Sequence, residues 1–297
     1  MPTEPMAEPA VAPPPALWLV DKAAGPTSHD IVARARRRIG RKVKVGHCGT
    51  LDPFATGLLV VMVGRATRLA PYLSGLDKTY LATLRTGFTS ATLDPEGPIE
   101  PSGAPATAER LLEVLPGFTG LQSQRVPALS AVKVEGERLY AKARRGEQVD
   151  LPERKVVIHS VRLVDDLGAG EFTIEVRCSK GTYIRRLAGD IGERLGCGAY
   201  CSALRRTAVG DLLVADAVGL DEVGPLGGLD PLRGLGHMPV RTLSAEETAR
   251  VLHGHRVEDA GVAGAPVALV SAGRLVAIAA PDGAGSLQPS VVLEDPR

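Results

Sequence analysis

The residues best suited to chemistry stand in a glycine-rich segment, residues 46–57, which contains His47, Cys48 and Asp52. An Asp-Pro pair in such a segment is most often a turn residue whose carboxylate bonds its own backbone. A carboxylate that faces a cleft can instead serve as a nucleophile or as a base. His47 and Cys48 would also permit metal ligation or a Cys-His nucleophile. By itself, the segment leaves all of these interpretations open.

Spacing argues against two other kinds of site. Cys197 and Cys201 are separated by three residues, and the sequence has no second pair of ligands at such spacing. Structural zinc usually takes four ligands in two close pairs. Segment 46–57 also lacks the helix with Lys-Ser or Lys-Thr that follows a phosphate-cradling loop. The sequence therefore predicts neither a structural zinc nor a Walker-type loop.

Positive charge is concentrated in two stretches, although the net charge of the 297 residues is only +1. Such blocks can neutralise the phosphates of a nucleic acid and release its counterions. Either block alone is more often the solvated face of a helix. The blocks consist of Arg34, Arg36, Arg37, Arg38, Arg41, Lys42 and Lys44, and of Lys133, Arg138, Lys142, Arg144 and Arg145.

The elements on either side of segment 46–57 are predicted from the apolar pattern. Residues 17–20 form a short apolar run, and residues 27–30 have the pattern of a capping box that opens a helix ending at Gly40. One side of this helix is apolar, which leaves its arginines facing water or a ligand. Residues 58–63 form a continuous apolar run typical of a buried strand. Segment 46–57 is therefore expected to be an irregular loop rooted on a core strand, where chemistry tends to be found.

Further elements follow the same kinds of pattern. Strands are predicted where β-branched residues partly alternate, at residues 79–85, 156–164 and 172–178. Helices are predicted at residues 107–115, 137–145 and 183–195. Gly196 supplies the C′ residue of the last helix. The irregular alternation of strands and helices favours an α+β domain.

Composition and the positions of glycine- and proline-rich stretches predict the domain organisation. Residues 1–16 mix Pro, Ala and Glu without a basic region, so they are interpreted as a disordered leader and not as a secretory signal. Residues 17–220 are the predicted main domain, residues 221–236 a linker rich in Gly, Leu and Pro, and residues 237–297 a small, mostly β domain. That small domain is expected to contain a hairpin formed by residues 267–270 and 275–278.

The bulk composition excludes several classes of protein. Hydrophobic residues make up 44% and charged residues 23%, close to the averages of soluble globular proteins. The longest apolar run is far shorter than the roughly 20 residues that cross a bilayer. Four irregularly spaced cysteines in a chain without a signal favour reduced thiols in the cytoplasm.

Six short motifs follow one another along the chain. They are Leu19-Val20-Asp21-Lys22, the whole of segment 46–57, Asp77-Lys78-Thr79-Tyr80, residues 124–127 (Gln-Arg-Val-Pro) with 130–133 (Ser-Ala-Val-Lys), residues 178–185 (Cys-Ser-Lys-Gly-Thr-Tyr-Ile-Arg) and Leu204-Arg205-Arg206. In this order they resemble the TruB family of tRNA pseudouridine synthases over nearly the whole chain. A chance match of six ordered motifs is negligible.

The resemblance implies a pseudouridine synthase fold with a central mixed or antiparallel sheet and a catalytic cleft, followed by a small PUA-like RNA-binding domain. It implies that Asp52 is the catalytic carboxylate. A nearby Arg185 would lower the pKa of that carboxylate by favouring its charged form. The other residues implied around the substrate are His47, Tyr80, Tyr183, Leu204 and Lys22.

The implied reaction converts uridine 55 in the T loop of tRNA to pseudouridine. It involves no net redox change or hydrolysis, so no cofactor or metal is expected. Asp52 could attack or stabilise the oxocarbenium-like sugar, or act as a base toward it. The target base must leave its stack first, and a ring such as Tyr80 offers it a face. The expected partner is the T arm of tRNA, bound by a cytoplasmic monomer without a membrane or protein partner.

One departure from the family concerns residues 90–94, Ser-Ala-Thr-Leu-Asp. The family usually shows Thr-Asp-Thr-x-Asp in this run, so Ala91 replaces an acidic residue. The loss puts in doubt any loop contact or active-site coupling assigned to that carboxylate. Activity is still expected, because Asp52, Tyr80, Tyr183 and Arg185 are unchanged.

Two alternatives remain open. A guide-dependent pseudouridine synthase would share the Asp52 loop and act within a ribonucleoprotein, although the short C-terminal unit and the absence of long basic tails weigh against it. A tRNA-binding or folding factor whose catalysis is incidental or lost would use the same cleft. A carboxylate facing RNA phosphate has no use in a pure binder, so Asp52 favours the enzyme.

Overall fold

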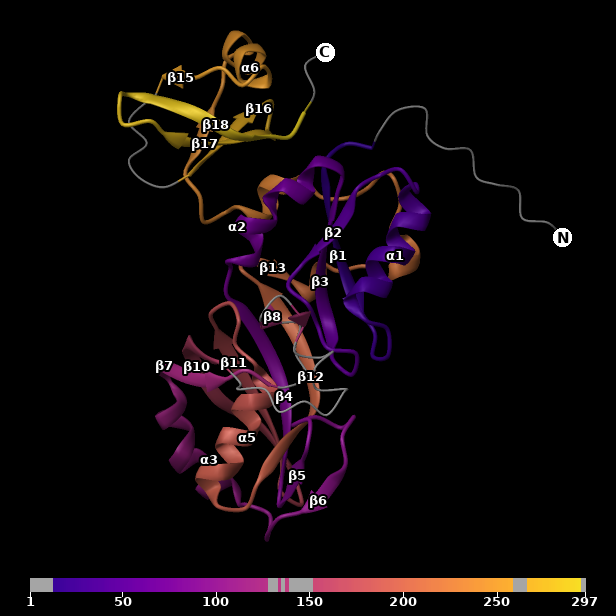
Figure 1. The fold of residues 1–297 in the computed structure, drawn as a ribbon, viewed down its shortest axis with the longest axis vertical. Helices are drawn as coiled ribbons and strands as arrows, with labels where there is room; N and C mark the ends of the chain where they lie inside the picture. Colours follow the sequence, from indigo (N-terminus) through magenta and orange to yellow (C-terminus); the bar gives the residue numbers. More distant parts are fainter. Residues whose placement is uncertain (1–12, 128–132, 135–136, 139–151, 259–265, 295–297) are drawn as a thin grey trace, which may run out of the picture. The chain divides into compact units, whose positions relative to one another are not determined.

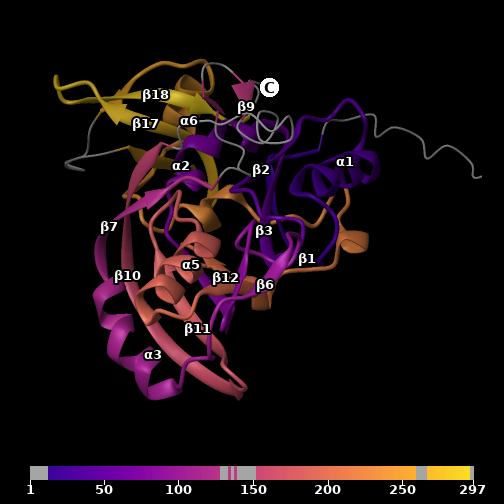
Figure 2. The ribbon, with the colours of Figure 1, turned by 60° about the horizontal axis from the view of Figure 1, so that its bottom comes forward.

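The computed structural model describes residues 13–127, 133–134, 137–138, 152–258 and 266–294 (Figures 1 and 2). The chain divides into two compact units, each made of segments that are distant in the sequence. Unit 1 comprises Met1–Pro53, Gly57–Gly75 and Gly210–Arg297, and unit 2 comprises Phe54–Thr56 and Leu76–Val209. The domain boundaries expected from composition remain predictions.

The first sheet of unit 1 is built on a strand that is buried along almost its full length. β3 (Thr56–Val63) pairs antiparallel with β1 (Ala16–Lys22), from Ala16 opposite Val63 to Lys22 opposite Gly57. It also pairs antiparallel with β2 (Val45–Cys48). The uninterrupted apolar run of β3 therefore corresponds to a central strand, which needs no polar face.

Helix α1 (Ser28–Ile39) packs on this sheet and confirms the predicted helix. Asp30 N donates to Thr27 Oγ1 at 3.1 Å and Thr27 N donates to Asp30 Oδ2 at 2.9 Å, which completes the capping box. The helix ends at Ile39, with Gly40 as the C-cap at φ +140°. Its apolar side is buried as expected, through Ile31, Val32, Ala35 and Ile39 packed with Trp18, Val20, Leu59 and Val61.

The chain continues from β3 through a 3₁₀ helix, η1 (Gly64–Leu69), and helix α2 (Ala70–Ser74). It returns to unit 1 through β13 (Leu212–Leu213), η3 (Val214–Asp216), η4 (Leu220–Glu222) and η5 (Pro231–Gly234). This returning segment is bonded to β1: Leu17 N donates to Leu229 O at 2.9 Å, and Leu229 N donates to Leu17 O at 2.8 Å. The predicted linker is therefore anchored to the first strand of the chain.

A second sheet of unit 1 lies near the C-terminus and has the order β14-β16-β17-β18-β15. Its strands are β14 (Val240–Thr242), β15 (Val257–Glu258), β16 (Val267–Ser271), β17 (Arg274–Pro281) and β18 (Ser286–Val292). Helix α6 (Ala245–Leu252) starts with a Ser244–Glu247 capping box and joins the core of this sheet through Val251. β16 and β17 form the expected hairpin, and the mostly β character of this region is confirmed.

Unit 2 is organised around antiparallel strands in the order β12-β4-β11-β10-β7. They are β4 (Lys78–Thr86), β7 (Gly120–Arg125), β10 (Glu153–Gly168), β11 (Glu171–Cys178) and β12 (Ala199–Val209). Along β4 buried residues alternate with more exposed ones, as the period-two pattern predicts. All three strands expected in this region are confirmed, and β10 extends beyond its predicted ends.

Two helical segments and a hairpin complete unit 2 (Figure 1). α3 (Ala108–Val114) runs into η2 (Leu115–Phe118) and contacts α5 (Ile184–Leu195), while β5 (Phe88–Ser90) pairs with β6 (Ile99–Pro101). A Cβ at Gly192 would collide with the backbone of Ala199, so this glycine lets α5 approach the start of β12. Gly196 follows α5 at φ +76°, the left-handed C′ position predicted from the sequence.

Two local expectations are wrong. Gly46, His47 and Cys48 belong to β2, because their backbone groups pair with β3 despite the glycine in this stretch. The loop is therefore limited to residues 49–55. The helix expected at residues 137–145 is contradicted at its start, where β9 (Glu137–Arg138) pairs with β8 (Lys133–Val134). Residues 139–145, with three members of the second basic block, lie outside the described residues.

Candidate active site

Asp52 lies in unit 1, half-buried, on the loop of residues 49–55 between β2 and β3. The residue before it, Leu51, is buried and is held by the side chain of Ser28. Ser28 Oγ donates to Leu51 O at 3.0 Å and accepts from Leu51 N at 2.9 Å. The loop is therefore attached to the first turn of α1 immediately before the carboxylate.

The residue after Asp52 is held as well. Pro53 O accepts hydrogen bonds from Gly25 N at 2.8 Å and from Lys22 Nζ at 3.1 Å. Lys22, at the end of β1, is completely buried, and its Nζ also donates to Ala23 O at 3.0 Å. The resemblance implies a substrate contact for Lys22, whereas these contacts direct its ammonium group to the backbone of the Asp52 loop.

His47 lies in β2, close to a second imidazole. Its ring centroid is 5.5 Å from that of the exposed His29 on α1, with the ring planes at 80°. The next residue, Cys48, is buried, and its thiol donates to Ser74 Oγ at 3.7 Å. Reactive cysteines are partly exposed thiolates, so this environment does not favour the Cys-His nucleophile.

The four cysteines are free and buried. Burial raises the pKa of the Cys178 thiol to about 11, which keeps it protonated near neutral pH. Among the residues that the structure describes, no three His, Cys, Asp or Glu side chains are grouped as metal ligands.

Tyr80 and Leu204 lie in unit 2 on neighbouring strands. β4 pairs with β12 so that Tyr80 is opposite Arg206 and Ala82 is opposite Leu204, without a bulge between these pairs. Directly paired residues and residues two apart share one face of a sheet. Tyr80 and Leu204, which are 8% and 7% exposed, are therefore diagonal neighbours on the same face.

Tyr183 precedes α5 and is half-buried. Its backbone N donates to Gln124 Oε1 at 3.0 Å, and its carbonyl oxygen accepts from Gln124 Nε2 at 3.3 Å. Gln124 comes from β7 and is buried. The Gln-Arg-Val-Pro motif therefore fixes the start of α5, two residues before Arg185.

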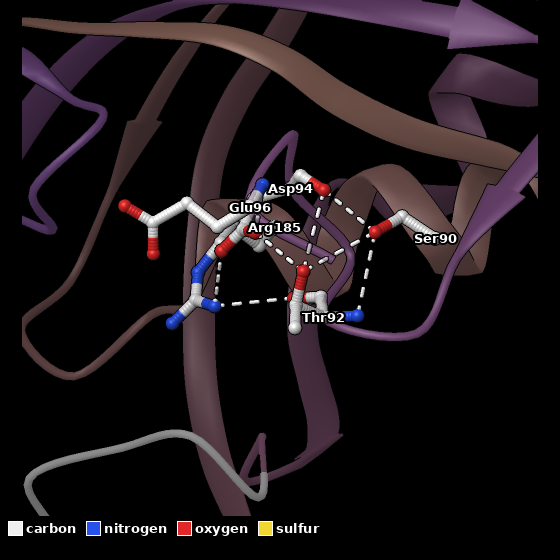
Figure 3. A network of polar contacts seen from close by, with 5 residues as sticks. All are labelled: Ser90, Thr92, Asp94, Glu96 and Arg185. Atoms are coloured by element: carbon white, nitrogen blue, oxygen red, sulfur yellow. Dashed lines mark hydrogen bonds and ion pairs between the residues drawn. The ribbon is translucent and has the colours of Figure 1, made fainter. Parts of the chain in front are cut away.

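Arg185, in the first turn of α5, forms an ion pair with a carboxylate that sequence reasoning did not assign. Its Nη1 donates to Asp94 Oδ2 at 2.6 Å and to Thr92 O at 3.1 Å (Figure 3). Asp94 Oδ1 accepts from Thr92 Oγ1 and, at 3.0 Å, from Glu96 N. The side chains of Arg185 and Asp94 are only 4% and 3% exposed. A buried pair with these additional hydrogen bonds is held in a single geometry.

The loop that presents Asp94 contains a residue in the left-handed region. Leu93 has φ +64°, a conformation that costs a non-glycine residue about 1–3 kcal/mol and persists only where the surroundings fix it. Cys201 N donates to Leu93 O at 3.0 Å, and Ser90 Oγ donates to Asp94 O at 2.6 Å. On the α5 side, a Cβ at Gly189 would lie 3.0 Å from Leu93 Cδ2. Contacts on several sides therefore hold this turn.

The same loop contains Ala91, the residue that departs from the family. Ala91 is exposed, and the carboxylate that Arg185 meets is Asp94, three residues later in the same run. Sequence reasoning missed Asp94, Ser28 and Gln124 as supporting residues. The only signal in the sequence was their place in or beside the quoted motifs.

The expected site residues are thus distributed over both units. Lys22, His47 and Asp52 belong to unit 1, where Lys22 directly supports the Asp52 loop. Tyr80, Tyr183, Arg185 and Leu204 belong to unit 2, with Tyr80 and Leu204 on one face of the sheet and the other two at the start of α5. Electrostatic support of Asp52 by Arg185 stays a prediction.

Two family models match the chain. Residues 36–184 match the model described as TruB family pseudouridylate synthase (N terminal domain), and residues 185–226 match the one described as tRNA pseudouridylate synthase B C-terminal domain. The chain is 46% identical over 292 residues to tRNA pseudouridine synthase B of Synechococcus sp. (strain WH7803), covering 93% of this chain and 96% of the relative. It is also 46% identical over 286 residues to tRNA pseudouridine synthase B of Thermobifida fusca (strain YX), covering 92% and 97%.

Solved structures show a similar fold. One is an H/ACA RNP bound to a substrate RNA containing 2'-deoxyuridine, with a TM-score of 0.72, 22% identity and coverage of 95% of this chain and 86% of that chain. Another is a Cbf5-Nop10-Gar1 complex, with a TM-score of 0.71, 23% identity and coverage of 95% and 85%. Together with the antiparallel central sheet, these similarities confirm the predicted α+β fold class. No helix in the described part of the chain is long and apolar enough to cross a membrane.

Proposed function

Because the chain belongs to the TruB family of tRNA pseudouridine synthases, and is therefore an isomerase of uridine in tRNA, we propose that its target is uridine 55 of the T loop and that Asp52 is its catalytic carboxylate. The observation that carries the proposal is the fixed loop around Asp52. Leu51, before it, is hydrogen-bonded to Ser28 at the start of α1, and Pro53, after it, is hydrogen-bonded to Lys22 at the end of β1 and to Gly25 in the turn that follows. The enzyme acts as a cytoplasmic monomer on the T arm.

The reaction itself explains why a fixed carboxylate is useful. The bond between sugar C1′ and uracil N1 breaks, the uracil turns, a C1′–C5 bond forms, and the hydrogen at C5 is released as a proton while N1 gains one. Asp52 either attacks the sugar or acts as a base toward it. Both routes require an ionised carboxylate at one position relative to the sugar, and a misplaced group loses much of its effect.

The unit 2 residues are assigned to the flipped base. Tyr80 offers a ring face and Leu204 an apolar neighbour on the same side of the sheet, in keeping with the way flipped bases are held between aromatic and apolar side chains. Arg185 acts as an electrostatic support whose position is set by Asp94. Tyr183, whose backbone is held by Gln124, is assigned to the same base. His47 is assigned to it as well, on the strength of the family resemblance.

The C-terminal sheet with α6 is assigned a supporting role as a PUA-like RNA-binding domain. It is a distinct five-stranded sheet with its own apolar core. No catalytic residue is assigned to it, so its contribution is to affinity for tRNA.

The proposal is tested with the protein alone and an unmodified tRNA transcript that carries [5-³H]uridine. We expect tritium release without any guide RNA, and mass spectrometry of the product should place pseudouridine at position 55. A transcript with cytidine at position 55 serves as the control and should release no tritium. Activity that requires an added guide RNA would instead support a guide-dependent enzyme, and tRNA binding without release would support a binding factor.

The basic residues of α1 and of the turn that follows it are proposed to contact tRNA phosphates, and the structure separates them into two groups. Arg36 Nη2 donates to Val45 O at 3.1 Å, and Arg38 Nε donates to Val223 O at 2.9 Å, so both side chains hold protein backbone. Arg37 and Arg41 are exposed and make no hydrogen bond or ion pair with the residues that the structure describes. These two arginines are the better candidates for RNA contacts.

Replacing both with glutamine, Arg37→Gln/Arg41→Gln, is expected to weaken tRNA binding and reduce its salt dependence. The slope of log Kobs against log salt should become shallower by about 0.7–0.9 for each phosphate that the protein no longer neutralises. Binding is measured by filter retention between 50 and 200 mM salt. The matched control is Arg110→Gln/Arg162→Gln, which removes the same charge at two arginines paired with Glu113 and Glu175. Equal slopes for the two double variants would refute an RNA contact by Arg37 and Arg41.

A further inference from the structure

Ser28 is the first residue of α1, yet its hydroxyl is not used to cap that helix. The capping box is completed by its neighbours Thr27 and Asp30. Ser28 is completely buried, and its Oγ is directed across to Leu51, 23 residues further along the chain. Two adjacent hydroxyl residues therefore have different tasks: Thr27 starts the helix, and Ser28 binds the loop.

The contact between Ser28 and Leu51 uses both functions of a hydroxyl group. Oγ donates to Leu51 O at 3.0 Å and accepts from Leu51 N at 2.9 Å. Leu51 lies outside every helix and strand and is 3% exposed. Its backbone N–H and C=O groups therefore have neither water nor a neighbouring strand as a hydrogen-bond partner. Buried backbone groups of this kind need partners. The serine provides them as a strand neighbour would.

This contact fixes the peptide group directly before Asp52. Leu51 O and Asp52 N belong to one planar peptide unit, so holding the oxygen orients the backbone of Asp52. The residue before a proline is confined to extended conformations. Pro53 O is in turn held by Gly25 N and Lys22 Nζ. With both sides held, the backbone from which the Asp52 side chain projects is fixed.

We propose that Ser28 is a positioning residue of the isomerisation, which places the Asp52 carboxylate without contacting the substrate. The inference rests on the proposed catalytic role of Asp52. Without the hydroxyl, the backbone groups of Leu51 must reach other partners, and the loop must move to do so. A displacement of about 1 Å at a reacting group can lower a rate by about 100-fold.

The test compares Ser28→Ala with wild type in single-turnover tritium release at saturating enzyme. The rate is expected to fall by about 10- to 100-fold, while the Kd for tRNA changes by less than about threefold, because the loop shifts and the binding surface does not. Ser28→Cys keeps a side chain of similar size with a weak donor and acceptor. Its rate is expected to lie between those of Ser28→Ala and wild type, a graded rescue that bulk destabilisation would not produce.

The matched control is Thr27→Ala, which removes the neighbouring hydroxyl. It weakens the helix cap and lowers Tm, but it leaves the Ser28–Leu51 contact intact. Its rate should stay close to that of wild type.

Three outcomes would overturn the proposal. They are a Ser28→Ala rate within about threefold of wild type, equal rate losses in Ser28→Ala and Thr27→Ala at similar Tm, and, should Ser28→Ala not fold, a wild-type rate in Ser28→Cys. A failure of the proposed function would look different, since wild type itself would release no tritium or Asp52→Asn would be as active as wild type.

Discussion

Asp52→Asn is expected to abolish pseudouridine formation while leaving the protein folded and able to bind tRNA. Asparagine has nearly the same shape as aspartate but can neither attack the sugar nor take up a proton from it. Removal of an essential nucleophile typically costs about 10⁴- to 10⁶-fold in rate. The loop is held through the backbones of Leu51 and Pro53, so the substitution leaves its hydrogen bonds in place. Tritium release, tRNA retention on filters and Tm together measure the three expectations.

The control for this substitution is Asp30→Asn, on the same unit of the protein. Hydrogen bonds from Thr27 hold the pKa of the Asp30 carboxyl below its ordinary value, and asparagine can accept the same capping bonds. Activity close to wild type is expected. A protein that binds tRNA and stays fully active after Asp52→Asn would refute the catalytic assignment. Persistence of a tRNA-folding phenotype in that variant, without chemistry, would favour the binding-factor alternative.

Breaking the Asp94–Arg185 pair is expected to have the largest effect on stability. Asp94→Asn leaves the guanidinium of Arg185 buried beside a neutral amide, and removing one partner of a buried pair costs about 3–5 kcal/mol. We expect the free energy of unfolding in urea to fall by this amount. The rate should fall as well, because Arg185 is placed by Asp94 Oδ2 and Thr92 O.

A double variant separates stability from chemistry. Asp94→Asn/Arg185→Met removes both buried charges, and loss of a whole buried pair is often neutral for stability. The free energy of unfolding of the double variant should therefore be close to that of wild type. Its activity should stay low, because the guanidinium group of Arg185 is missing. Glu175→Gln is the control, since its exposed pair with Arg162 should contribute less than about 1 kcal/mol. A double variant with restored activity would show that Arg185 is a purely structural residue.

Local pattern predicted much of the scaffold. The apolar run of β3, the period-two alternation of β4 and the 3.6-residue periodicity of α5 are properties of short windows, and each window folded as its pattern indicates. The Thr27–Asp30 capping box and the C′ residue Gly196 are equally local. Boundaries were less predictable, since β2 takes in Gly46–Cys48 only because β3 lies beside it.

The supporting contacts of the site could not be predicted in the same way. Asp94 meets Arg185 across 91 residues, Gln124 meets Tyr183 across 59, and Ser28 meets Leu51 across 23. No periodicity connects such partners, because the fold alone brings them together. The family resemblance marked Asp52 and Arg185 as a set but did not indicate which neighbours hold them. The start of the helix expected at 137–145 was wrong for a related reason, since residues 137 and 138 pair with β8 instead.

The left-handed turn at Leu93 links two positions that are nearly a hundred residues apart. A Cβ at residue 189 would lie 3.0 Å from Leu93 Cδ2, so the side chain of Leu93 would have to shift slightly to admit it. A larger residue at 189 would press on Leu93 and, through it, on the loop that orients Asp94. The side chains that fit at positions 93 and 189 therefore depend on each other. A smaller side chain at residue 93 would leave more room for a side chain at residue 189.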